Sequence, residues 1–185
     1  MALTESTMLE LGTEAPAFTL PDVVSGNPVR LDDFRGSKAL LVMFICAHCP
    51  YVKHIEKSLG KLSADYKGKP LAIVAISSND VTTHPADSPD GLRAQAKANG
   101  FEFPYLYDES QAVAHAYKAA CTPDFFLFDK DFRLAYRGEY DSSRPGNGVP
   151  ITGEYLRAAI DTVLAGKPVP PDQRPSIGCN IKWKG

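Results

Sequence analysis

The sequence contains no apolar run long enough to cross a lipid bilayer. Its longest, Ala39 to Cys46, falls far short of the roughly 20 residues that a spanning helix needs. The first residues, MALTESTMLELGTEAP, also lack the basic start and the long apolar segment of a secretory signal. We therefore expect a cytoplasmic protein that has no membrane partner.

The sequence has no cluster of basic residues either. Its 20 lysines and arginines are balanced by 22 acidic residues, for a net charge of −2. Nucleic-acid binding needs concentrated positive charge, so we expect no nucleic-acid partner. With 185 residues and 44% hydrophobic content, the chain can bury one sizeable core. We predict a single domain over residues 1–185, with a proline-rich and irregular tail, residues 167–185, packed on it.

Cysteine is scarce, with four residues: Cys46, Cys49, Cys121 and Cys179. A framework of disulfides is typical of short secreted chains and is not expected in a cytosolic domain of this length. The cysteines therefore indicate redox chemistry, metal binding or packing. We interpret Cys121 and Cys179 as packing residues. The alternatives are a third redox thiol for Cys121 and a resolving thiol for Cys179.

Strand and helix patterns alternate along the chain. Residues 38–45 are a continuous apolar run, typical of a buried central strand, and residues 50–66 have one apolar helical face. Further strands are expected at residues 17–22 and 26–31, which form a hairpin, at 70–77, at 103–108 and as a pair within 124–140, and further helices at 92–98, 110–120 and 152–166. This order predicts an α/β fold with a mixed central sheet flanked by helices.

The motif Cys46-Ala47-His48-Cys49 lies where the central strand ends and the next helix begins. The attacking species in thiol–disulfide exchange is the thiolate, and a helix N-terminus favours an anion through its unpaired N–H groups and its dipole. A protonated His48 would add a further favourable charge. We predict that Cys46, at a solvent-accessible strand end, attacks, and that Cys49 resolves the mixed disulfide. The motif therefore predicts a thiol–disulfide oxidoreductase with a Cys46–Cys49 redox pair.

The motifs GTEAPAFTLPD, LDDFRG, CAHCPYVKHIE, CTPDFFLFD, DSSRPGNGVP and PSIGCNIKWK resemble those of thioredoxin-like redoxins, specifically the alkyl hydroperoxide reductase / thiol-specific antioxidant (AhpC/TSA) group. The resemblance covers nearly the whole chain. It implies a thioredoxin-like fold with an extra N-terminal hairpin, and a cis Pro123 facing the redox pair. It also implies that Thr122, the residue before that proline, binds extended substrates through its backbone. Leu40 stands where thioredoxins carry a buried acid.

Peroxiredoxins share this fold, so a thiol peroxidase with an antioxidant role is the alternative. Cys49 would then react with peroxide to form a sulfenic acid, with Cys46 as the nearest resolving thiol. Arg137 is the candidate cation for the reacting oxygen, although we interpret it as an exposed strand residue. A third hypothesis is a carrier of Cu(I) or another thiophilic metal that adds His84 as a ligand. A structural zinc site is disfavoured because no second CxxC is present.

The first hypothesis requires no metal and no cofactor. Its partners are protein or small-molecule disulfides and thiols, together with a thiol reductant system. Peroxides replace the disulfide substrate under the peroxidase alternative. The sequence carries no signal for the oligomeric state.

Overall fold

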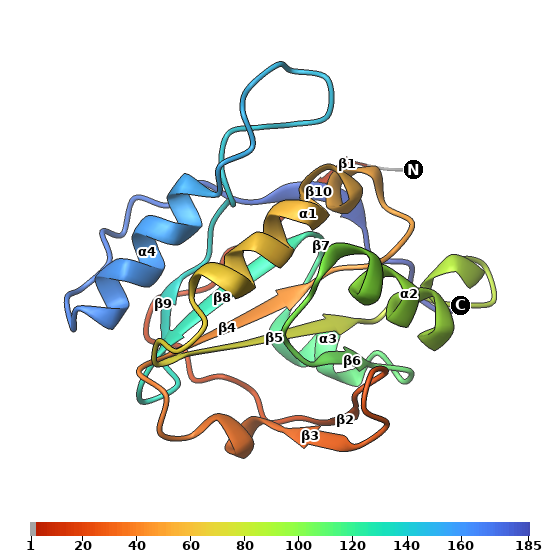
Figure 1. The fold of residues 1–185 in the computed structure, drawn as a ribbon, viewed down its shortest axis with the longest axis horizontal. Coiled ribbons are helices and arrows are strands. Elements are labelled where there is room, and N and C mark those ends of the chain that lie inside the picture. The colour runs from red at the N-terminus through yellow and green to blue at the C-terminus, as the bar shows by residue number, and fades with distance from the viewer. Residues whose placement is uncertain (1–2) are drawn as a thin grey trace.

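A five-stranded mixed sheet forms the centre of the structure, a computed structural model that describes residues 3–185 (Figure 1). The strand order is β6-β5-β4-β8-β9. The strands are β4 (Ala39–Phe44), β5 (Leu71–Ser77), β6 (Tyr105–Tyr107), β8 (Asp124–Asp129) and β9 (Leu134–Tyr136). Strands β4, β5 and β6 are parallel, whereas β8 is antiparallel to both β4 and β9. The predicted α/β class and mixed sheet are confirmed.

Strand β4 is buried along its whole length because both faces of the sheet are covered. Leu41 and Met43 belong to a core shared with helices α1 (Pro50–Asp65), α2 (Pro89–Asn99) and α4 (Glu154–Leu164). Leu40, Val42 and Phe44 belong to the opposite core, which includes helix α3 (Ala112–Tyr117). An unbroken apolar sequence is what a strand covered on both faces requires.

Two smaller sheets flank the central one. Strands β2 (Thr19–Pro21) and β3 (Pro28–Arg30) form the predicted N-terminal hairpin. Strands β1 (Leu3–Glu5), β10 (Ile177–Asn180) and β7 (Cys121–Thr122) form an antiparallel sheet with β10 in the middle. The prediction of an irregular tail was therefore wrong for Ile177–Asn180, which pairs with edges contributed by two distant segments. Pairing with distant segments leaves no strand pattern in the proline-rich sequence around these residues.

Helix boundaries follow the capping residues. Pro50 stands in the first turn of α1, where its missing N–H has no cost. Helix α2 begins earlier than predicted because the Ser88 side chain accepts a hydrogen bond from Gly91 N at 3.4 Å. Two short 3-10 helices, η1 (Leu31–Phe34) and η2 (Pro85–Asp87), complete the fold. Within residues 3–185, none of the helices has the length and apolarity that a membrane span requires.

Candidate active site around Cys46, Cys49 and Cys179

The junction between β4 and α1 holds the two cysteines of the motif. Ile45 N still donates to Ile76 O at 3.0 Å, so the chain leaves the sheet only at Cys46. Cys49 is the capping residue of α1 and its carbonyl accepts from Lys53 N at 2.9 Å. Both cysteines are fully buried. The prediction of a solvent-accessible Cys46 was therefore wrong, because Thr122 and Asp87 lie against its sulfur and Gln95 donates to its carbonyl.

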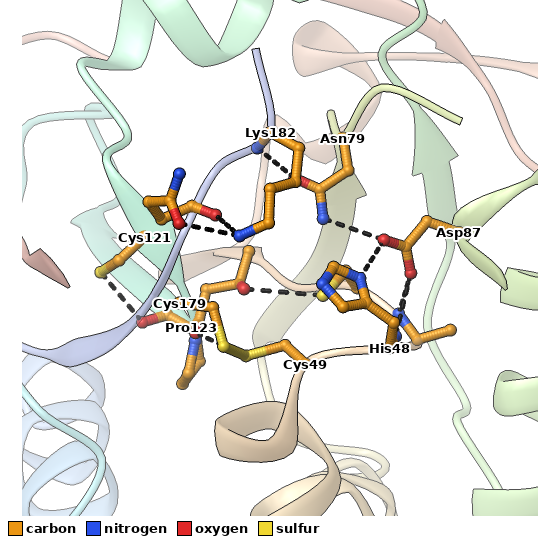
Figure 2. Close-up of a disulfide and its surroundings, with 12 residues drawn as sticks. His48, Cys49, Asn79, Asp87, Cys121, Pro123, Cys179 and Lys182 are labelled. Atoms are coloured by element: carbon orange, nitrogen blue, oxygen red, sulfur yellow. Dashed lines mark hydrogen bonds and ion pairs between the residues drawn. A yellow bond between two sulfur atoms is a disulfide. The ribbon is translucent and has the colours of Figure 1, made fainter. Parts of the chain in front are cut away.

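The disulfide joins Cys49 to Cys179 of strand β10, 130 residues away in the sequence (Figure 2). Cys46 is free. The bond present here is therefore not the predicted Cys46–Cys49 bond, and that redox pair stays a prediction. The reason lies in the tail: β10 lies next to β7, and the register sets Cys179 opposite Thr122. The disulfide makes Cys179 a member of the site rather than a packing residue alone.

Thr122 contacts both cysteines of the motif. Its Oγ1 lies 3.5 Å from Cys46 Sγ, and its carbonyl oxygen lies 3.5 Å from Cys49 Sγ. The Thr122–Pro123 peptide bond is cis, as predicted. Gly178 allows strand β10 to approach this residue, since a Cβ at Gly178 would lie 2.0 Å from Thr122 O. The backbone edge that the resemblance assigns to a substrate is occupied here by the protein's own tail.

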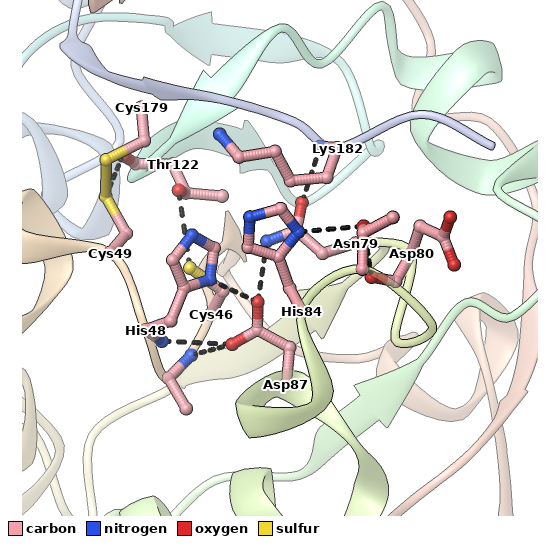
Figure 3. Close-up of polar contacts among 12 residues, drawn as sticks. Cys46, His48, Cys49, Asn79, Asp80, His84, Asp87, Thr122, Cys179 and Lys182 are labelled. Carbon is pink, nitrogen blue, oxygen red and sulfur yellow. Dashed lines mark hydrogen bonds and ion pairs between the residues drawn. A yellow bond between two sulfur atoms is a disulfide. The ribbon is translucent and has the colours of Figure 1, made fainter. Parts of the chain in front are cut away.

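His48 is held by a buried carboxylate that the sequence did not reveal. Its Nδ1 contacts Asp87 Oδ2, and Asp87 Oδ1 accepts from the backbone N–H groups of Ala47 at 2.7 Å and His48 at 3.0 Å (Figure 3). Asn79 Nδ2 donates to the same carboxylate at 3.0 Å. These four contacts satisfy a carboxylate that is fully withdrawn from solvent, as a buried charge requires.

The electrostatics of this group favour a charged imidazole next to a thiol. The bond to Asp87, followed by the one to Cys46, raises the pKa of His48 to about 9. Burial opposes ionisation of Asp87, but its bonds to His48 and Asn79 outweigh burial and keep its pKa below the usual value. Ligand atoms of Cys46, His48 and Asp87 lie within 4.8 Å of one another. The three residues place a thiol, an imidazole and a carboxylate in series, an arrangement that can activate a thiol for attack.

Asp87 and Asn79 were missed because they come from a loop whose letters carry no motif. A usable signal was nevertheless present. Strands β4 and β5 are parallel, so their carboxyl ends meet at one edge of the sheet, and the loop after β5 therefore lies next to the loop after β4. This chain has Leu40 at the position where thioredoxins carry a buried acid. Asp87 supplies a buried carboxylate from a different segment of the chain.

His84, the candidate ligand of a metal carrier, lies beside this group. Its ring centroid is 4.5 Å from that of His48. Burial and then the charge on His48 lower the pKa of His84. The compact donor set within residues 3–185 consists of Cys46, His48 and Asp87, and so includes neither His84 nor Cys49.

Two further candidates have structural surroundings. Burial and then Asp124 raise the pKa of the Cys121 thiol well above its usual value, which disfavours a thiolate. Arg137 is fully buried and donates to both Asp124 oxygens, at 3.2 and 2.9 Å. The prediction of an exposed arginine was therefore wrong, because a buried acid on the neighbouring strand and the Phe126 ring, 3.9 Å from the guanidinium, hold it inside.

The sequence and the fold both have relatives among known proteins. Residues 11–137 match the model of the AhpC/TSA family. A candidate peroxiredoxin of Mycobacterium tuberculosis is 32% identical over 117 residues, 63% of this chain and 69% of that protein. An uncharacterized conserved protein from Geobacillus kaustophilus is 54% identical, with a TM-score of 0.97 over 100% of this chain and 97% of that one. The thioredoxin domain of a thiol-disulfide oxidoreductase from Bacteroides vulgatus, 23% identical, matches 70% of this chain and 89% of that one with a TM-score of 0.60. The predicted thioredoxin-like fold is confirmed.

Proposed function

Because the chain belongs to the AhpC/TSA family, we propose that it is a thiol–disulfide oxidoreductase in which Cys46 attacks and Cys49 resolves. The observation that supports this most is the contact series from Cys46 through His48 to Asp87. A charged imidazole next to a thiol stabilises the thiolate, which is the nucleophile in disulfide exchange. The buried carboxylate fixes the imidazole and keeps it charged at neutral pH.

The reaction starts from the reduced protein. The Cys46 thiolate attacks one sulfur of a partner's disulfide, forms a mixed disulfide and releases the partner's other sulfur as a thiolate. Cys49 then loses its proton and attacks Cys46 Sγ, which forms a Cys46–Cys49 bond and releases the partner fully reduced. Thr122 and Pro123 are proposed to contact the partner through their side chains, since Thr122 Oγ1 lies 3.5 Å from Cys46 Sγ and the Thr122 backbone is already paired with β10.

Reduction of insulin disulfides with dithiothreitol as the electron source tests this assignment. We expect Cys46→Ser to reduce the rate by at least about tenfold. Cys49→Ser should accumulate a mixed disulfide at Cys46 when it is treated with a chromogenic aromatic disulfide. Cys121→Ser is the matched control and should keep the wild-type rate. A Cys46→Ser variant that is folded by circular dichroism and reduces insulin at the wild-type rate would refute the proposal.

A thiol peroxidase is the second candidate, and the Cys49–Cys179 disulfide is the observation that favours it. Attack of the Cys49 thiolate on a hydroperoxide would give a Cys49 sulfenic acid and an alcohol. Condensation with the Cys179 thiol would then form the observed bond and release water. Arg137 is an unfavourable cation for this reaction because it is fully buried against Asp124.

Peroxide consumption by the single-cysteine variants separates the two candidates. If Cys46→Ser still consumes peroxide and carries a trappable Cys49 sulfenic acid, the peroxidase assignment holds. Loss of peroxide consumption on Cys49→Ser alone would support the same assignment.

We further propose that the protein works in the cytoplasm, where disulfides of this kind turn over rather than persist. Cell fractionation followed by immunoblotting tests that location.

A further inference from the structure

We propose that Cys179 is a third redox thiol, and that the Cys46 thiolate exchanges into the Cys49–Cys179 disulfide. In this step Cys46 Sγ attacks Cys49 Sγ, a Cys46–Cys49 bond forms, and the Cys49–Cys179 bond breaks. The negative charge moves from Cys46 to Cys179, which then takes a proton from water. One S–S bond is exchanged for another, so the step needs neither an oxidant nor a reductant. It rests on the proposed function, because the same Cys46 thiolate carries both.

The three sulfurs converge on one residue of strand β7 (Figure 3). Cys46 Sγ and Cys49 Sγ each lie 3.5 Å from an atom of Thr122, and Cys179 pairs with Thr122 across the β10–β7 ladder. The free thiol and the disulfide therefore share a single supporting residue. The sulfur with an activating histidine, Cys46, is the one that the disulfide leaves free.

The position of Cys179 is set by strand β10, which is paired along both of its edges. Strand β10 pairs with β1 on one side and β7 on the other, and Gly178 permits the close approach to Thr122 O. Beyond the strand, the ring of Trp183 stacks on His115 with 4.2 Å between ring centroids. Breaking the disulfide thus leaves the Cys179 thiol docked beside the site, so the exchange can run in both directions.

Asn79 joins the tail to the group that activates Cys46. Its side-chain oxygen accepts from Lys182 N at 2.8 Å, and its side-chain nitrogen donates to Asp87 at 3.0 Å. Gln111 also donates to the Lys182 carbonyl, at 2.9 Å. The tail is therefore bonded to the same side chain that helps to hold Asp87 against His48. A tail that only filled space would not need this connection.

Alkylation of the oxidised, folded protein tests the exchange. The full chain is treated with N-ethylmaleimide near neutral pH, quenched with acid and mapped by mass spectrometry without reduction. We expect some molecules to carry the label on Cys46 with a Cys49–Cys179 bond, and others to carry it on Cys179 with a Cys46–Cys49 bond. In Cys46→Ser, labelling of Cys179 should fall by at least about tenfold, whereas the control Cys121→Ser should match the wild type.

A second measurement does not depend on the Cys46 variant. Cys179→Ser, oxidised with glutathione disulfide, should form the Cys46–Cys49 bond. The proposal is overturned if Cys179 of the wild type stays unlabelled while the protein is folded, if Cys46→Ser labels Cys179 as fast as the wild type does, or if Cys179→Ser forms no such bond. Insulin reduction keeps the proposed function separate, since Cys46→Ser can lose that activity whether or not Cys179 is ever labelled.

Discussion

Replacement of Asp87 by asparagine should remove most of the charge from His48 at neutral and mildly alkaline pH. The substitution keeps the size of the side chain. It also keeps an oxygen for the backbone N–H groups of Ala47 and His48, which donate to Asp87 Oδ1 at 2.7 and 3.0 Å. It removes the negative charge whose bond is the largest cause of the raised His48 pKa. The imidazole should then titrate closer to its ordinary value, with the bond to Cys46 still raising its pKa.

The magnitude follows from the two pKa values. The difference between about 9 and 6.5 corresponds to roughly 3 kcal/mol at about 1.36 kcal/mol per pKa unit. The His48 side chain is 20% exposed, so solvent screening makes this an upper bound. At pH 8, about nine tenths of His48 is charged with a pKa of 9 and only about 3% with a pKa of 6.5. The charged population therefore falls by up to about thirtyfold, with thirtyfold reached only if the whole shift is lost.

The rate of Cys46 alkylation by iodoacetamide in the fully reduced protein reports this change. We expect Asp87→Asn to slow the reaction at pH 8 by up to about an order of magnitude, because the thiolate loses its neighbouring cation. Asp90→Asn is the matched control, since that carboxylate is exposed and pairs with Arg93. Equal Cys46 rates for Asp87→Asn and the wild type between pH 6 and 9 would refute the role given to this carboxylate.

The same substitution should change how stability depends on pH. The pKa of His48 is raised on folding, so its contribution is complete below pH 6.5 and is lost as the pH rises through about 9. The pKa of Asp87 is lowered, so its contribution is present above its ordinary value and is lost in acid. The wild-type advantage over Asp87→Asn in urea unfolding should therefore shrink from pH 6.5 to pH 9. An advantage that grew over that interval would have the wrong sign.

Three further predictions concern the surroundings of the site. Gly178→Ala should lower the yield of the Cys49–Cys179 disulfide on oxidation, measured by peptide mapping, because the new Cβ would lie 2.0 Å from Thr122 O. Gly185→Ala is the control and should have no effect, because that glycine has open space around it. Equal disulfide yields for the two variants would count against a tightly fitted β10. Arg137→Met should lower the free energy of unfolding by about 3–5 kcal/mol, because it leaves the buried Asp124 charge without its partner. Urea denaturation measures this loss, and the double variant Arg137→Met/Asp124→Asn should recover part of it. A loss under about 1 kcal/mol would contradict the buried ion pair. Cys121 should be the slowest cysteine to alkylate in the fully reduced native protein, because burial keeps its thiol protonated. Mass spectrometry of the labelled peptides gives the order in which the cysteines react. Labelling of Cys121 as fast as that of Cys46 would be the contrary result.

The sequence was sufficient for the elements whose signals are local. Residues 38–45 are apolar without interruption because β4 is covered on both faces, and the helix after Pro50 shows its buried face every three or four residues. The position of Cys49 at the start of α1 follows from the same two signals. The cis bond before Pro123 came from the family resemblance, since composition alone gives an X–Pro bond only a low chance of being cis.

The features that the sequence did not reveal depend on contacts between distant segments. Asp87 and Cys46 meet because β4 and β5 are parallel neighbours, and nothing in the letters of the 78–88 loop shows that its carboxylate turns inward. Arg137 reads as a surface residue until Asp124 is placed beside it. Charged side chains are rarely buried without a partner, so their burial follows from the partner and not from the residue type.

The pairing of Cys49 was the hardest feature to anticipate, because four cysteines leave three ways to form two disulfides and no spacing chooses among them. Here the choice depends on strand register. Cys179 faces Thr122 in the β10–β7 ladder, and a shift by one residue would set Gly178 in that place and turn the cysteine to the other face of the strand. The identity of the redox partner of Cys49 is therefore determined by the backbone pairing of a tail strand. For the same reason, a substitution that disturbs that ladder should act on Cys49 chemistry without touching either residue of the CxxC motif.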